Sequence, residues 1–225
     1  MSRPLALVRP EPGWSASAAA ARAVGIEVVG HPLFEGEAVA WELPRGDFDA
    51  LLVGSSAAFR HGGPQLAQVD ALPVYAVGES TAAAGRAAGF QVARTGDRGL
   101  QSLLDDGEGR PMRFLRLAGA ERVALDPHPG QSIVECTVYR MATRPVGGEF
   151  AAALTRSPLV ALHSAAAAHH FAQEADRLGI ARSALFLLAL GPRVAKAAGL
   201  GWAAVHLADK PTDAALLAKA AALCK

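Results

Sequence analysis

Short apolar runs alternate with longer alanine-rich runs along the whole chain, and this alternation restricts the fold more than any other feature. Most short runs are continuously apolar, as expected for strands that helices cover on both faces. Strand–helix alternation favours parallel sheets. We therefore predict an α/β fold class with doubly wound parallel sheets. The predicted strands are residues 5–8, 27–30, 49–53, 74–77, 91–93, 114–117, 133–139, 159–163, 185–190 and 203–207.

Glycines and small polar residues mark where the intervening helices begin and end. Gly25 follows the first alanine-rich run, and Gly89 and Gly199 follow two later ones, as is typical of C-terminal helix caps. Thr212 is the predicted N-cap of the last helix, which covers residues 213–223.

The two halves of the chain resemble each other. Leu52-Val53-Gly54-Ser55-Ser56 has a counterpart in Ala161-Leu162-His163-Ser164-Ala165, and residues 74–78 have one in 188–191. The offset is roughly 110 residues, which is too long for a solenoid repeat and indicates a duplicated domain.

Two extended segments, 32–44 and 137–148, interrupt the alternation at matching places in the two halves. We interpret them as connectors between domains. If the chain crosses at both, one domain comprises residues 1–34 plus 145–225 and is built from both termini. Residues 35–144 then form an inserted second domain.

Composition excludes several classes of protein. The formal net charge is +1, which argues against a broad nucleic-acid-binding face. No apolar stretch reaches the roughly 18–20 residues of a membrane span, and no signal peptide is evident. Cys136 and Cys224 are far apart in sequence and are interpreted as free thiols. We therefore expect a cytoplasmic protein that binds neither nucleic acid nor membrane.

Small polar residues and glycines follow several predicted strands, where ligands bind in open parallel sheets. Backbone N–H groups at such turns, together with helix N-termini, suit carboxylates or phosphates. Arg9 directly follows the first strand and is the basic residue best placed to join them. The candidate binding residues from these turns are Arg9, Ser55, Ser56, Gly78, Thr81, Ser164, Ala165 and Gly191.

Other sites are disfavoured by spacing. His169 and His170 are adjacent on a predicted helix and point in different directions, and no carboxylate or cysteine completes a metal site with His163. Neither G-x-G-x-x-G after the first strand nor a phosphate-binding loop is present, which disfavours a nucleotide-dependent sensor or enzyme.

Taken together, these motifs resemble the uroporphyrinogen-III synthase family over nearly the whole chain and in the family's order. Two departures concern hydroxyl groups, since Gly54 and Val194 stand where the family usually has threonine. The residues that carry the resemblance are Leu7 to Pro10, Asp49 to Val53 with Ser55, Val77-Gly78 with Thr81-Ala82, Leu117 to Gly119 with Arg122, Val138-Tyr139-Arg140, Ser164, Leu190-Gly191-Pro192, and Pro211-Thr212 with Leu216-Leu217.

The resemblance implies two flavodoxin-like α/β domains, joined by a two-stranded connector, with the substrate between them. It implies an enzyme that cyclises hydroxymethylbilane, a linear tetrapyrrole with eight carboxylates, to uroporphyrinogen III with loss of water and inversion of ring D. It also implies that no metal or organic cofactor is used, that the enzyme is a monomer, and that hydroxymethylbilane synthase hands over the substrate.

The same resemblance adds three residues to the candidate site. Gly119 and Arg122 would bind substrate, and Tyr139 would assist catalysis by hydrogen bonding without being essential. The alternative is a non-catalytic two-domain binding or regulatory protein for a small anionic ligand, which would close on an anion without transforming it.

Overall fold

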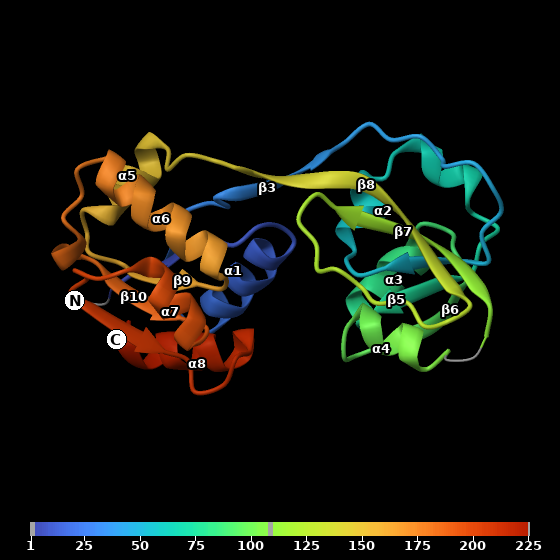
Figure 1. The fold of residues 1–225 in the computed structure, drawn as a ribbon. Coiled ribbons are helices and arrows are strands. Elements are labelled where there is room, and N and C mark those ends of the chain that lie inside the picture. Colours follow the sequence, from blue (N-terminus) through green and yellow to red (C-terminus); the bar gives the residue numbers. More distant parts are fainter. Residues whose placement is uncertain (1–2, 108–109, 225) are drawn as a thin grey trace. The chain divides into compact units, whose positions relative to one another are not determined.

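The computed structural model describes residues 3–107 and 110–224, which divide into two compact units. Unit 1 contains the described chain as far as Glu35 and again from Thr143 onward, and unit 2 is Gly36–Ala142. Each unit has its own sheet with helices packed on it, and both ends of the chain lie in unit 1 (Figure 1).

Unit 1 is built on a five-stranded sheet in which each strand pairs with its neighbours in parallel. The strand order is β11-β10-β9-β1-β2. Counted by their sequence within the unit, the strands have the flavodoxin-like order 2-1-3-4-5. The bounds are β1 Leu5–Leu7, β2 Val28–Val29, β9 Leu159–Leu162, β10 Phe186–Ala189 and β11 Ala204–Leu207.

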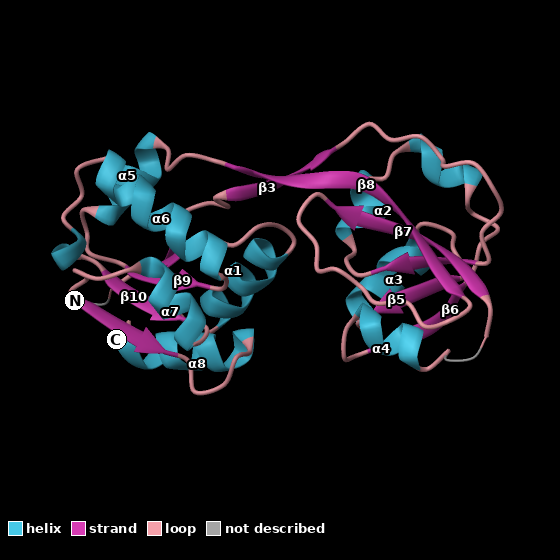
Figure 2. Ribbon diagram, viewed as in Figure 1, coloured by secondary structure: helices cyan, strands magenta, loops and turns pink. Residues whose placement is uncertain are grey.

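Helices cover both faces of this sheet (Figure 2). Successive strand residues point to opposite faces, so β1 sends Ala6 into one core and Leu5 and Leu7 into the other. The helices are α1 Gly13–Ala23, α5 Gly148–Leu154, α6 Ala165–Arg177, α7 Pro192–Ala198, α8 Asp213–Leu223 and the short 3-10 helix Arg182–Ala184. Thr212 caps α8, as predicted, because its side chain accepts a hydrogen bond from Ala215 N.

Unit 2 has the same spatial arrangement of strands as unit 1, but the chain enters that arrangement at a different strand. Its strand order is β3-β8-β7-β4-β5-β6, and β8-β7-β4-β5-β6 matches β2-β1-β9-β10-β11 of unit 1. This equivalence is the one that the internal sequence repeat requires. The bounds are β3 Phe34–Ala38, β4 Ala50–Val53, β5 Val74–Val77, β6 Val92–Gly96, β7 Met112–Gly119 and β8 Gln131–Thr143.

The helices of unit 2 are short. They are α2 Ala57–His61, α3 Glu79–Ala87, α4 Leu100–Asp105 and the 3-10 helix Pro64–Gln68. Leu51 and Val53 pack into the larger core, whereas Ala50 and Leu52 pack with Phe114 under α4. The predicted α/β fold class with parallel sheets is therefore confirmed.

The two segments interpreted as connectors contain more regular structure than the sequence suggested. Residues 34–38 of the first form β3, and the second is occupied as far as Thr143 by the end of β8. The two strands are neighbours in the sheet of unit 2, and both cross the boundary between units. Extended segments without a helical pattern do not reveal from sequence alone that they pair with each other.

Candidate functional site

Both units have a point where the strand order reverses, and ligands bind beyond the carboxyl ends of the strands at such points. In unit 1 the point lies between β1 and β9, and in unit 2 between β7 and β4.

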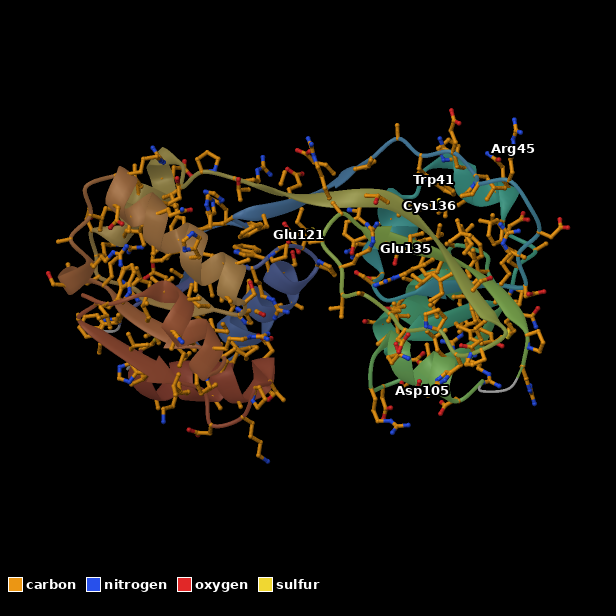
Figure 3. The ribbon with its side chains drawn as sticks, in the orientation of Figure 1. Trp41, Arg45, Asp105, Glu121, Glu135 and Cys136 are labelled. Atoms are coloured by element: carbon orange, nitrogen blue, oxygen red, sulfur yellow. The ribbon has the colours of Figure 1, made fainter. Side chains whose placement is uncertain are left out.

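A pocket of about 480 Å³ opens at this edge of unit 2. It is bordered by the ends of β4, β5 and β7, by the start of α4, and by the loop that follows β7. Glu121, in that loop, is labelled in Figure 3. The lining residues are Gly54, Ser55, Val77, Arg98 to Gln101, Arg116 to Gly119, Glu121 to Leu125, and Tyr139.

The structure brings together some of the residues that the sequence marked in unit 2. Those that line the pocket are Ser55, Gly119, Arg122 and Tyr139. Those outside its lining are Ser56, Gly78 and Thr81. Ser56 and Gly78 directly precede helices, and Thr81 is buried within α3. The N–H of Gly78 donates to Gly96 O, so the sheet already uses it.

The ring of Tyr139 lies against the backbone of Gly119. A Cβ on Gly119 would lie 2.8 Å from Cζ of that ring, so a larger residue would displace the tyrosine. The ring also lies beside His61, with centroids 6.1 Å apart. Gly119 thus gives Tyr139 its place in the pocket wall, a role that the sequence did not reveal.

Three charged residues form a cluster at the pocket: Arg116 from β7, Glu135 from the neighbouring strand β8, and Arg122 from the loop that follows β7. Arg116 Nη1 donates to Glu135 Oε1 at 2.7 Å, and Arg122 Nε donates to Glu135 Oε2 at 2.7 Å. Burial alone would raise the pKa of Glu135, but the hydrogen bonds from Arg122 and Arg116 outweigh it and lower that pKa. Glu135 is therefore ionised at neutral pH, and two cations share one anion.

Arg116 and Glu135 were not among the predicted site residues. Arg116 lies within a strand rather than after one, and its side chain is only 5% exposed. The signal that could have found it is an arginine in the otherwise apolar run Phe114-Leu115-Arg116-Leu117, because a buried charge needs a partner.

At the corresponding edge of unit 1, Arg9 belongs to a network of hydrogen-bonded polar side chains. Its Nη1 lies 2.9 Å from Asp213 Oδ1 and donates to Ser17 Oγ at 2.9 Å. His163 Nε2 lies 2.8 Å from the same Asp213 oxygen. The prediction that Arg9 lies at the sheet edge is confirmed, and the edge also holds three polar partners that spacing did not reveal.

The charges of this network balance. Burial lowers the pKa of His163 more than its hydrogen bond to Asp213 raises it, so the imidazole is neutral at neutral pH. Burial would raise the pKa of Asp213, but hydrogen bonds from His163 and Ser17 lower it. Arg9 is then neutralised by Asp213, whereas in unit 2 two arginines share the single carboxylate of Glu135, which leaves one positive charge. The unit 2 pocket is accordingly the stronger candidate site for an anion.

The other predicted residues of unit 1 lie at helix starts. Ser164 caps α6 by accepting a hydrogen bond from Ala167 N at 3.1 Å, and Ala165 is the first residue of that helix. Gly191 directly precedes α7. Helix starts of this kind present N–H groups to anions.

Ser164 offers a way to separate capping from ligand binding. Ser164→Ala is expected to cost about 1 kcal/mol of stability, because the cap is lost, and Ser164→Gly only a few tenths. Thr212→Ala removes a comparable cap from α8 and is the matched control. Chemical denaturation and steady-state kinetics check this. A substrate role for Ser164 predicts a higher KM for Ser164→Ala than for Thr212→Ala, and equal values would remove that role.

The described residues contain neither a group of three or more histidine, cysteine and acidic side chains placed to hold a metal ion nor a helix long and apolar enough to span a membrane.

Comparisons with known proteins agree on one family. Residues 15–218 match the family described as Uroporphyrinogen-III synthase HemD. No curated protein sequence matches the chain. Among solved structures, uroporphyrinogen-III synthetase from Helicobacter pylori is 19% identical with a TM-score of 0.66, covering 98% of this chain and 99% of that one. A mutant uroporphyrinogen III synthase from Thermus thermophilus is 18% identical with a TM-score of 0.50, covering 97% and 98%.

At these sequence identities the solved structures establish the fold alone, and the family assignment rests on the match to the family model. The match spans most of both units, including β4 and β7 at the reversal point of unit 2 and β9 at that of unit 1, whereas β1 precedes it. The chain belongs to the uroporphyrinogen-III synthase family, whose members are lyases acting on hydroxymethylbilane.

Proposed function

We propose that this chain cyclises hydroxymethylbilane to uroporphyrinogen III and that the unit 2 pocket binds carboxylates of that substrate. The observation that carries the binding site is the excess of cations at the pocket, where Arg116 and Arg122 share the single carboxylate of Glu135. A substrate with eight carboxylates supplies the missing negative charge.

The reaction depends more on how the protein positions the linear tetrapyrrole than on chemical activation of it by side chains. Loss of the hydroxyl as water leaves an azafulvene cation, which the pyrrole nitrogens stabilise by donating electron density. The terminal ring then attacks, and ring D is inverted through a spiro intermediate. The protein must hold a flexible polyanion so that its two ends meet, which is catalysis by proximity. This mechanism needs neither a metal nor an organic cofactor.

Several residues are proposed to hold the substrate. Arg122 and the turn at Ser55 act from the pocket, and Arg9, held by Asp213, acts from the edge of unit 1. The start of α6 at Ser164 and Ala165 and the turns at Ser56 and Gly191 are proposed to supply further polar contacts. Gly78, before α3, and Thr81, in its first turn, are proposed to form a surface that the substrate approaches closely, since the N–H of Gly78 is used by the sheet.

Tyr139 is proposed to assist the departure of the hydroxyl by hydrogen bonding. Its ring lies in the pocket wall, and its strand neighbours β7. Tyr139→Phe is expected to lower kcat by only a few-fold, because a neutral phenol is a weak acid. Tyr75→Phe is the control, since Tyr75 packs in the smaller core of unit 2. Full turnover by Tyr139→Phe would remove the hydroxyl from the mechanism.

A coupled assay tests the function. The protein is supplied with freshly made hydroxymethylbilane, the products are oxidised, and the type I and type III isomers are separated. We expect the type III isomer in excess. Type I alone, which forms spontaneously, would reject the proposal and favour a binding protein.

The proposal also includes the setting of the reaction. We propose a cytoplasmic monomer that receives its substrate from hydroxymethylbilane synthase. Hydroxymethylbilane cyclises spontaneously to the wrong isomer, so prompt transfer would limit that loss.

A further inference from the structure

Arg116 is unusual because it is an arginine enclosed in a sheet. It lies in β7, directly opposite Glu135 of β8, and its side chain is only 5% exposed. Its Nη1 donates to Glu135, but its Nε is buried and has no hydrogen-bond partner among the described residues. Buried donors are nearly always paired, so an unpaired one beside a pocket indicates a missing acceptor.

Glu135 uses both of its carboxylate oxygens on arginines. Oε1 accepts from Arg116 and Oε2 from Arg122, each at 2.7 Å. Arg122 is fixed further, because its Nη1 donates to Gly119 O at 2.9 Å and to Thr137 Oγ1 at 2.8 Å. Both guanidinium groups are therefore held in place before any ligand arrives, which reduces the entropy lost on binding. Glu135 lies on β8 (Figure 3).

Charge separates this cluster from a purely structural ion pair. A single arginine opposite Glu135 would be neutral overall and complete. The second arginine leaves one positive charge at the pocket wall, where Arg116 and Arg122 are both lining residues. Arg98 and Glu121, which also line the pocket, cancel each other in net charge.

We propose that Arg116 and Arg122 form a carboxylate subsite of the unit 2 pocket and that Glu135 is a positioning residue holding both guanidinium groups. The subsite deepens the proposed function, because the carboxylate is assigned to the tetrapyrrole substrate. Glu135 itself does not touch the substrate.

Binding of uroporphyrin III, a stable octacarboxylate, tests the subsite without requiring turnover. Glu135→Gln keeps the size of the side chain and removes the charge that orients both arginines. We expect its Kd for uroporphyrin III to rise about tenfold, and its KM for hydroxymethylbilane to rise with little change in kcat. Glu37→Gln is the matched control, because Glu37 pairs with Arg140 of the same strand β8, outside the pocket lining. It should leave both constants unchanged.

A readout in the absence of ligand checks the positioning. In protein with ¹⁵N-labelled arginine, the Nε–H signal of Arg122, identified by its loss in Arg122→Lys, should shift in Glu135→Gln and stay fixed in Glu37→Gln. In the double variant Arg122→Lys/Glu135→Gln, the Kd for uroporphyrin III should rise by less than the product of the two single fold-changes. Both changes disrupt the same contact, so their effects should not add in free energy.

Thr137→Val provides a second variant if Glu135→Gln fails to fold. It removes one acceptor from Arg122 and leaves the Arg116–Glu135 pair intact, so it should weaken uroporphyrin binding by a few-fold.

Each outcome decides the subsite. A shifted Arg122 signal with an unchanged Kd would make the cluster structural and overturn the proposal, as would an unshifted signal or a wild-type protein that does not bind uroporphyrin III. Wild-type protein that binds the porphyrin through this cluster but forms only the type I isomer would keep the subsite and reject the proposed reaction.

Discussion

Replacing Phe171 with alanine is expected to lower the stability of unit 1 by about 3–5 kcal/mol, and Phe114→Ala to do the same in unit 2. Both side chains are among the largest that are fully buried in the described chain, at 0% and 1% exposure. Phe171 stacks on Trp202 with ring centroids 5.9 Å apart, and Phe114 meets Tyr75 edge-on at 5.6 Å. Removing either ring leaves a cavity that the neighbouring strands cannot close.

The two losses should be local, because each buried cluster draws its residues from one unit only. Hydrogen exchange, followed by mass spectrometry of peptides from each unit, checks this. Phe171→Ala should speed exchange in β9 and β10, and Phe114→Ala in β4 and β7. Leu200→Ala, at a side chain 90% exposed, is the control and should change stability by less than about 0.5 kcal/mol. Equal loss of protection in both units from either variant would contradict the prediction.

Glu174→Gln is expected to destabilise unit 1 in a pH-dependent way. Glu174 is buried in α6, where Oε2 accepts from the backbone N–H of Val146 at 2.6 Å and Arg177 donates to both carboxylate oxygens. The Arg177 hydrogen bond is the largest influence on the pKa of Glu174, which falls from 4.5 to about 2. The contact also ties the chain that follows β8 to α6.

The sign follows from that depressed pKa. The folded state holds the ionised form more tightly, so the stabilisation is fully present above pH 4.5 and is lost as pH falls towards 2. A shift of this size corresponds to stability on the order of 3 kcal/mol at pH 7. Denaturant unfolding should show this difference in the free energy of unfolding between wild type and Glu174→Gln at pH 7. The difference should become smaller below pH 4.5.

Asp176→Asn is the control for this experiment. Asp176 lies in the same helix and pairs with Arg182, but its side chain is 58% exposed. Water screens such a pair, so the free energy of unfolding should hardly change at any pH. Glu174→Gln with the stability of wild type at pH 7 would show that the carboxylate is not needed to hold Val146.

One departure from the family has a local explanation. Gly54 stands where the family usually has threonine, and a Cβ at Gly54 would lie 3.0 Å from Cδ1 of Leu100. Leu100, the first residue of α4, lines the same pocket. In this chain the apolar side chain of Leu100 occupies the space beside that turn, which leaves little room for a larger residue at Gly54.

The sequence alone determined the types of the elements and the edges at which polar residues gather. Continuous apolar runs identified the buried strands. Glycines and capping residues identified the ends of helices, for example Thr212 as the N-cap of α8. Arg9 and Ser164 were correctly assigned to strand ends, because their positions follow from local order along the chain. These features depend on neighbours within a few residues, which a single sequence displays.

Only the tertiary structure decided which distant residues meet. Arg116 and Glu135 face each other because β7 and β8 pair in one particular register, and His163 meets Asp213 because β9 ends beside the start of α8. A shift of one residue along β8 would turn Glu135 to the other face of the sheet. Periodicity reports which face of an element is buried but not what lies opposite, so the charge balance that distinguishes the two edges appeared only with the fold.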